Sequence, residues 1–257
     1  MDWLKFRASA AAPLFLGEDG LTKNQLDKIE ELIAKEKRTE IQEQTLIDLI
    51  KKRDAPIELS KGAKSYIESV VDEYVYGYKD SVDNKYTRKG TLVEDSEDQD
   101  YNKSDIQLAN VVLFKDYVKS NSYLKKGHFH GHPDIEDEEE QEIADVKSSW
   151  NKKTFPKKPE DGENSTYEWQ GKLYCYMKGW YKFKLIYGLM STPEEMVPDW
   201  EHPSLHYVDD LPINLRITVI NYTLLPEDIA KIEKREKAAV KYAEEYYNYL
   251  INKNKNV

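Results

Sequence analysis

The feature that most constrains the fold is a change in the spacing of apolar residues near residue 128. Between residues 20 and 78 the apolar positions recur every three or four residues, which is the spacing of one helical face and predicts helices. Ser60 is placed to cap the last of these helices. From residue 128 to 149 the spacing falls to two, which predicts two short strands around an acidic turn. Helices must therefore pack against a sheet.

The segments after residue 149 alternate between the two patterns. A helix is predicted over 165–177, strands over 181–190 and 215–222, and a closing helix over 226–250 with proline in its first turn. This order predicts an α/β fold, with a central mixed β-sheet flanked by helices and a helical N-terminal portion. We expect a single domain over 1–257: the helical portion at about 1–110, the sheet core at about 111–225 and the C-terminal helix at about 226–252.

Composition removes several classes of protein. No apolar run approaches the ~20 residues needed to span a bilayer, and the N-terminus lacks a secretory signal, so we expect a cytoplasmic protein without a membrane partner. Cys175 is the single cysteine, which excludes intramolecular disulfides and cysteine-held metal clusters. The net charge of −10 argues against a polyanionic partner, but the acids gather at 94–100 and 136–142, while lysines cluster at 125–126 and 152–158.

Two aspartates flank the acidic turn. A hairpin folded symmetrically about the turn places Asp134 opposite Asp145, and His132 opposite Lys147. Opposed residues on one sheet face have Cβ atoms ~4.5–5.5 Å apart, so the two carboxylates repel each other unless a divalent cation lies between them. Lys147 projects on the same side as Asp145 because side chains alternate along a strand. A metal ion with an ammonium group beside it is the equipment of phosphodiester hydrolysis.

The same residues carry a resemblance to a known superfamily. Pro133 and Asp134, followed after ten residues by Asp145, Val146 and Lys147, resemble the PD-(D/E)XK signature of metal-dependent nucleases. The signature is short, and by itself it is weak.

Two further motifs stand in the order that the superfamily has them. Gln170 and Tyr174 resemble the QxxxY motif, and their spacing places both on one face of the predicted helix. Gly90 and Glu94 resemble the GxxxE element, whose glutamate joins the metal site from a helix. With these motifs the chain resembles the phage lambda-type and YqaJ-like recombination exonucleases.

The resemblance implies a restriction-endonuclease-like core and a particular metal site. Asp134, Asp145 and the main-chain carbonyl of Val146 would hold Mg²⁺, with Mn²⁺ as an alternative, and Glu94 would reach the metal directly or through water. Lys147 would orient or activate the attacking water.

It also implies how the substrate is bound. The segment with Arg7 and Ser9 is similar to the opening segment of the lambda-type enzymes, in which a serine, an arginine and the QxxxY glutamine bind the 5′-phosphate. Ser9 and Gln170 would do so here, with Tyr174 beside them; Arg7 is a further candidate, although its spacing from Ser9 differs from that in the lambda-type enzymes. His132 stands where lambda-type enzymes can carry serine, and it is expected to touch the substrate.

The reaction implied by the resemblance is 5′→3′ hydrolysis of linear double-stranded DNA from its ends, leaving a single strand for recombination. A homo-oligomer and a single-strand annealing protein as partner are implied as well, in the host cytoplasm if the chain is phage-encoded. Two alternatives stay open: a structure-specific or restriction-like endonuclease on the same core, and a non-catalytic DNA-binding protein.

Each piece also has a plain structural interpretation. Asp134 is a turn acid, Ser9 a helix cap and Glu94 a surface residue when each is taken singly, and only their conjunction favours a nuclease. The alternating residues His128, His130 and His132 raise a zinc site as an alternative. No further ligand stands at zinc-site spacing, so we expect one or two of these histidines to line the approach to the acidic site.

Overall fold

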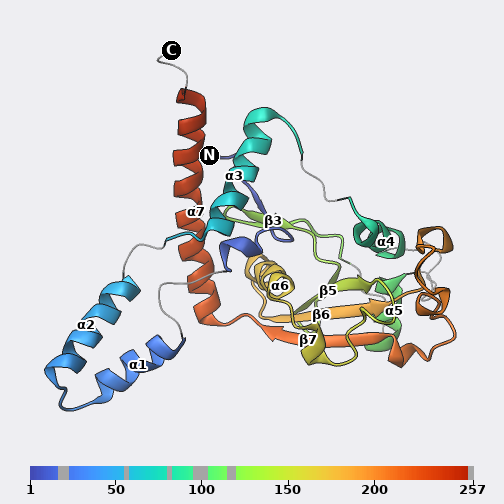
Figure 1. The fold of residues 1–257 in the computed structure, drawn as a ribbon, viewed down its shortest axis with the longest axis horizontal. Coiled ribbons are helices and arrows are strands. Elements are labelled where there is room, and N and C mark those ends of the chain that lie inside the picture. The colour runs from blue at the N-terminus through green and yellow to red at the C-terminus, as the bar shows by residue number, and fades with distance from the viewer. Residues whose placement is uncertain (17–22, 55–57, 80–82, 95–103, 115–119, 254–257) are drawn as a thin grey trace.

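The computed structural model describes residues 1–16, 23–54, 58–79, 83–94, 104–114 and 120–253, which form two sheets with helices around them (Figure 1). The helices are α1 (Lys23–Ala34), α2 (Glu40–Asp54), α3 (Lys61–Tyr76), α4 (Lys85–Glu94), α5 (Asp105–Leu113), α6 (Ser165–Lys178) and α7 (Pro226–Asn252). The strands are β1 (Phe6–Arg7), β2 (Leu124–Lys126), β3 (Phe129–Gly131), β4 (Ile135–Asp137), β5 (Glu142–Ser149), β6 (Lys182–Leu189) and β7 (Ile217–Thr223).

The larger sheet has the order β4-β5-β6-β7 and is mixed, as predicted. Strand β5 is antiparallel to β4 and parallel to β6, and α6 makes the crossover between the two parallel strands. Side chains alternate between its faces: Ile143 and Leu185 join the main core beneath α6, whereas Val146 and Ile186 pack with residues of α5 on the other face. The sheet is therefore buried on both sides, with helices as its two covering layers.

A second, smaller sheet has the order β1-β3-β2, and the sequence did not predict it. The segment from 128 to 149 was expected to be one hairpin, but β3 pairs with β1 and β2 while β4 pairs with β5. Three residues separate β3 from β4. The ring of Tyr174 lies 2.7 Å from where a Cβ of Gly131 would be, so β3 passes close to α6, and Pro133 has no N–H to donate to a ladder. Because β4 begins only at Ile135, the expected pairing of His132 with Lys147 lies outside the ladder of β4 and β5.

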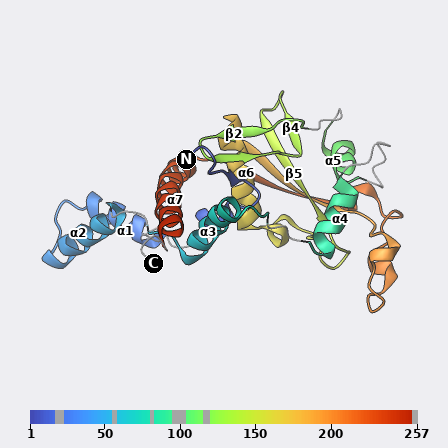
Figure 2. The same ribbon diagram turned by 90° about the horizontal axis from the view of Figure 1, so that it is seen from above.

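The predicted helices form where expected. Ser60 caps α3 by accepting a hydrogen bond from the Ala63 N–H, and α3 packs against α7 along the side of the molecule. Helices α1 and α2 form a hairpin that projects from the body and has its own small apolar cluster (Figures 1 and 2). Pro56, which the sequence places between the second and third helices of this pattern, lies outside the described residues. No helix in the described ranges is long and apolar enough to cross a bilayer.

The acidic turn between β4 and β5 is held by lysines from α6 and β6. Lys178 pairs with Glu138 at 2.9 Å and with Glu136 at 3.3 Å, and Lys182 pairs with Glu140 at 3.1 Å. These pairs neutralise much of the local negative charge. The turn lies at the end of β5 opposite to Ser149, so its charge is set back from the candidate site residues Asp145 and Lys147 farther along that strand.

Candidate active site

The two predicted metal-binding aspartates face each other across β4 and β5. The register pairs Ile135 with Ala144, and one further step along the same register sets Asp134 opposite Asp145, as predicted from the symmetry of the turn. The Asp134 Oδ2 accepts a hydrogen bond of 2.7 Å from the Val146 N–H, so its carboxylate is turned onto β5. The hairpin itself thus brings two carboxylates and the Val146 peptide together.

Lys147 and α6 fix the second aspartate. Lys147 Nζ lies 2.5 Å from Asp145 Oδ2, and Asp145 is 2% exposed. Gln170 Nε2 donates to Asp145 Oδ1 and to the Tyr174 hydroxyl, both at 3.0 Å. Helix α6 can approach the sheet this closely because Gly171 has no side chain: the Phe183 ring lies 2.1 Å from the position of its missing Cβ. The QxxxY residues therefore hold a carboxylate in place.

The electrostatics of the pair follow from this geometry. Burial and the neighbouring Asp145 charge raise the pKa of Asp134 well above its usual value. Burial alone would lower the pKa of Lys147, but attraction by Asp145 and Asp134 outweighs it, so the Lys147 pKa rises above its usual value. Burial and the Asp145 charge also raise the pKa of Tyr174, which stays a neutral phenol. The single Lys147 ammonium cannot neutralise two ionised carboxylates, so a bound cation would be electrostatically favourable here.

The donor set fits a hard divalent cation. Asp134, Asp145 and the Val146 carbonyl offer oxygen ligands, and Mg²⁺ commonly binds one or two carboxylates while keeping several waters. Within the described ranges no three side chains of His, Cys, Asp or Glu converge closely enough to hold a metal ion, so water would complete the coordination. The alternating histidines accordingly form no zinc centre there: His128 Nδ1 instead lies 2.9 Å from Glu236.

Glu94 reaches the same cavity from the end of α4. The cavity is about 500 Å³ in volume, and both candidate metal aspartates, Lys147 and Val146 line it as well. The Glu94 charge contributes to the raised pKa of Asp134, which places this carboxylate near the pair without making it a third direct ligand. Coordination through water, one of the two predicted modes, suits this position.

Asp105 is a site residue that the sequence did not reveal. It lines the cavity, is 3% exposed, and its Oδ1 has no hydrogen-bond partner among the described residues. Burial, followed by the Glu94 charge, raises its pKa to about 8. An acid directly after Ser104, which caps α5, is an ordinary helix-start signal. Nothing in the local pattern distinguishes it from a surface residue.

Most of the predicted substrate-binding residues converge on this cavity. Ser9, His132, Gln170 and Tyr174 line it, and the His132 Nδ1 lies 3.1 Å from the carbonyl of Ser122. Arg7 does not line it. Its exposed side chain belongs to β1, where it is paired in register with His130.

Helix α4 is fastened to the sheet by a buried lysine that was also missed. The Lys89 ammonium, 1% exposed, donates to the carbonyls of Ser149 at 2.7 Å, Met190 at 2.8 Å and Trp150 at 3.0 Å. One turn earlier, Lys85 pairs with Glu201 at 3.0 Å. These contacts tie the helix that carries Glu94 to the chain segments that follow β5 and β6.

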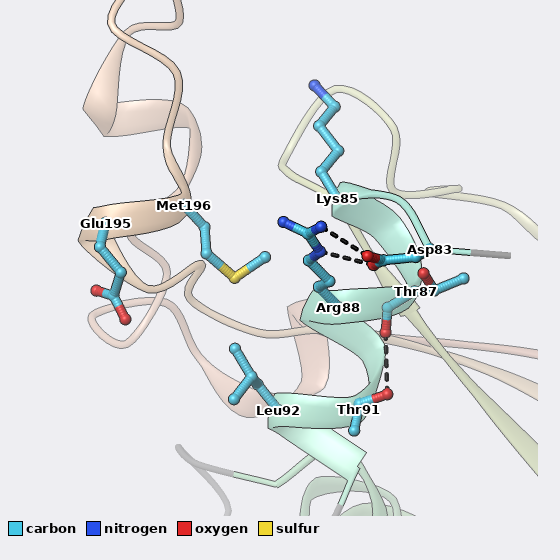
Figure 3. Close-up of a pocket in the computed structure, with 8 residues that line it drawn as sticks. All are labelled: Asp83, Lys85, Thr87, Arg88, Thr91, Leu92, Glu195 and Met196. Carbon is cyan, nitrogen blue, oxygen red and sulfur yellow. Dashed lines mark hydrogen bonds and ion pairs between the residues drawn. The ribbon is translucent and has the colours of Figure 1, made fainter. Parts of the chain in front are cut away.

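A second cavity of about 740 Å³ lies between the outer side of α4 and Met196 (Figure 3). Thr87 and Thr91 line both cavities, so α4 is the wall between them. The guanidinium of Arg88 points into the second cavity but is paired with Asp83 at 2.6 Å. Lys85, which also lines this cavity, is paired with Glu201, so the two lining cations both have acidic partners.

Comparisons with known proteins give the fold. No protein-family model matches the chain, and no curated protein sequence matches it. Among solved structures, the chain resembles a phage-related exonuclease from Haemophilus somnus 129PT, with a TM-score of 0.67 and 21% identity over 97% of this chain and 96% of that one. It also resembles the alkaline exonuclease LHK-Exo from Laribacter hongkongensis, with a TM-score of 0.55 and 13% identity over 98% and 96%.

The same LHK-Exo in complex with dAMP matches with a TM-score of 0.52 and 14% identity, over 98% of this chain and 94% of that one. At such identities the likeness establishes architecture rather than chemistry. The chain therefore has, over nearly its whole length, the restriction-endonuclease-like fold of phage-type exonucleases that its sequence motifs predicted.

Proposed function

We propose that this chain is a metal-dependent exonuclease that hydrolyses phosphodiester bonds at the ends of linear double-stranded DNA. The observation that carries the proposal is the pair of carboxylates, Asp134 and Asp145, held face to face with Lys147 at 2.5 Å from the second. The fold supports it, since the structural neighbours are named as exonucleases. A folded protein has little reason to hold two such acids together unless a cation offsets their repulsion.

The chemistry divides between the cation and the chain. Bound Mg²⁺ or Mn²⁺ would polarise a phosphoryl oxygen and lower the pKa of water. Asp134, Asp145 and the Val146 carbonyl would hold the ion, with Glu94 acting through water. Lys147 places a positive charge beside the site where the nucleophile approaches and negative charge develops.

Residues around the pair would position the DNA. Gln170 already donates to Asp145 Oδ1, so its first role is to hold that carboxylate in a fixed orientation. The Tyr174 hydroxyl accepts from Gln170 and keeps its own proton to donate. Ser9 and His132 line the cavity and can donate to phosphate oxygens, in line with binding of a 5′-phosphate.

The 5′→3′ polarity, the role in recombination, the homo-oligomer and the annealing partner belong to the same proposal and rest on the resemblance. The acidic turn, which would dock such a partner, keeps Glu138 73% exposed at its side chain even though Lys178 pairs with it. Serine at the turn acids should weaken capture of an annealing protein while nuclease activity is retained. Unchanged capture rejects the turn as the docking site.

The test is a time course on linear and closed circular duplex DNA, with and without a 5′-phosphate, in Mg²⁺ and in chelator. We expect digestion of the linear form alone, dependence on Mg²⁺, and loss of activity in Lys147→Ala. Lys182→Ala is the matched control, because Lys182 lies on β6 with its side chain 55% exposed, and its ammonium pairs with the turn acid Glu140. Digestion of closed circles would favour the endonuclease, and binding without hydrolysis would favour a non-catalytic DNA-binding protein.

A further inference from the structure

Of the three alternating histidines, His132 lines the catalytic cavity and His128 contacts Glu236, whereas His130 lies on the outer face of the small sheet. We propose that this face, here called the cationic strip and made of Lys5, Arg7, Lys125 and His130, binds the phosphate backbone of the DNA strand that leads to the catalytic cavity. The inference rests on the proposed nuclease function and adds a substrate-binding surface to it.

The strip follows from the alternation of side chains along the strands. In β1, Phe6 is fully buried while Arg7 is exposed, and in β3 Phe129 is fully buried while His130 is only half-buried. The apolar members face the core beneath α6, so the polar members face outward. The register pairs Arg7 with His130, and His130 with Lys125. Because neighbouring strands lie about 4.8 Å apart, these three side chains form one row across the sheet.

The strip is positively charged and lacks acidic partners. No ion pair joins Lys5, Arg7 or Lys125 to a carboxylate in the part of the chain that the structure describes. After burial, the influences that lower the pKa of His130 are Arg7, Lys5 and His132, all cationic or able to become so. Three cations on and beside one small sheet thus have no acidic partner among the described residues, and in a chain of net charge −10 this arrangement favours an external anion.

The strip runs directly into the catalytic cavity. Strands β1 and β3 are parallel, and two residues beyond Arg7 and His130 stand Ser9 and His132, which both line that cavity. The Tyr123 ring bridges the two histidines, with ring centroids 4.9 Å from His132 and 5.6 Å from His130. Exposed aromatic rings among cations are the usual equipment for binding a nucleic-acid strand.

Along the direction of the strands, on the side away from the cavity, the strip stops at His128. Both the main-chain N–H and the Nδ1 of His128 lie within hydrogen-bond distance of Glu236 Oε1 on α7, at 2.6 and 2.9 Å. This carboxylate would repel a phosphate, so the surface has one open end, and that end is at the cavity. A strand bound along the strip would therefore be led to Asp134 and Asp145.

The other basic cluster of the sequence is not equivalent. In the loop 152–158, Lys152 donates to the Ser204 carbonyl, and Lys157 donates to the carbonyls of Lys152 and Phe155. Lys126, the neighbour of Lys125, points to the opposite face of the small sheet. Its ammonium donates to the main-chain carbonyl of Tyr176 and lies 3.8 Å from the centroid of the Tyr176 ring. Lys126 is therefore a matched control for Lys125.

The experiment measures the binding of a fluorescent linear duplex by anisotropy in chelator, where no hydrolysis occurs, over a range of salt concentrations. One lost phosphate contact lowers the slope of log K against log salt by about 0.9, which is about eightfold in affinity at 0.1 M salt. We expect this loss for Lys125→Ser and no change for Lys126→Ser, which removes the same charge. Arg7→Ser combined with Lys125→Ser should lower the slope by about 1.8. Equal binding by the two single lysine variants overturns the strip.

Failure of the strip and failure of the nuclease are distinguishable. If the wild-type chain digests linear DNA in Mg²⁺ while both lysine variants bind like wild type, the strip is refuted and the nuclease stands. If DNA binding depends on Lys125 but nothing is digested, the proposed function fails and the binding surface stands. Thermal unfolding of each variant confirms that it is folded, and His130→Gln, which keeps a neutral polar side chain, provides a second probe expected to weaken binding less than Lys125→Ser.

Discussion

Replacing Asp134 with asparagine should make the metal-free protein more stable while abolishing its proposed activity. The Asp134 carboxylate faces Asp145, and burial and that charge raise its pKa well above the usual value. A carboxyl whose pKa is raised on folding costs nothing below its unfolded-state pKa, and the cost grows as pH rises through its folded-state pKa. The gain from Asp134→Asn is therefore small near pH 4 and largest in alkaline solution.

The size of the gain follows from the geometry. Two unit charges about 5 Å apart interact by about 3 kcal/mol at an effective dielectric constant of 20. Lys147 offsets part of this repulsion, and the asparagine oxygen can still accept from the Val146 N–H, so we expect a net gain of about 1–2 kcal/mol. For a chain of this size that corresponds to an increase in Tm of roughly 2–8 °C.

The assay is thermal unfolding at pH 8.5 and pH 4.5, in chelator and in Mg²⁺. Mg²⁺ should stabilise the wild type, by about 2.7 kcal/mol at one hundred times the dissociation constant, and should stabilise the variant much less. Asp161→Asn, at an exposed acid, is the control and should change neither value. An unchanged or lower Tm of Asp134→Asn in chelator at pH 8.5, or an equal gain from Mg²⁺ in both proteins, would refute the reasoning.

Three further outcomes are expected. Gln170→Leu removes the hydrogen bond that orients the Asp145 carboxylate. Single-turnover digestion should slow by roughly 100-fold, which is the effect of a ~1 Å misplacement, and a rate within twofold of wild type would contradict this role of Gln170. Lys89→Met removes the ammonium that three buried carbonyls share, and only the Trp150 carbonyl keeps a second side-chain donor, the Thr192 hydroxyl, among the described residues. The loss should be about 3 kcal/mol in urea unfolding, whereas a loss below about 0.5 kcal/mol would show that the contacts are unimportant. The pKa of Asp105 is about 8 in the folded protein, so between about pH 4 and pH 8 this carboxyl stays protonated when the chain is folded and loses its proton when the chain unfolds. The free energy of unfolding of the wild type should therefore fall by up to about 1.4 kcal/mol per pH unit over that range. Asp105→Asn should flatten that slope, and an unaltered slope assigns it to another group.

The sequence was sufficient where local periodicity decides the structure. The helix predicted over 165–177 and the strand predicted over 181–190 correspond to α6 and β6, because both segments are rich in apolar residues that the core buries. The opposition of Asp134 and Asp145 was also predictable, since the acidic turn between them fixes the register of a hairpin. The pair of candidate metal-binding aspartates is thus encoded within one short segment.

What the sequence missed depends on contacts between distant segments. The pairing of β1 with β3 joins residues near the N-terminus to residues near 130, and a strand of two residues is too short to show a periodic pattern in the sequence. Lys89 appeared to belong to a polar stretch because the three carbonyls that it binds follow β5 and β6 and meet only in the folded protein. Asp105 is unusual only through its burial beside Glu94.

The most direct test of the central claim is the anomalous difference density of crystals grown with Mn²⁺. We expect one strong peak between the carboxylates of Asp134 and Asp145, about 2.1 Å from an oxygen of each and near the Val146 carbonyl, and no peak in crystals of Asp145→Asn. Crystals of an active enzyme with no peak between these side chains, or with the two carboxylates turned apart, would contradict the account.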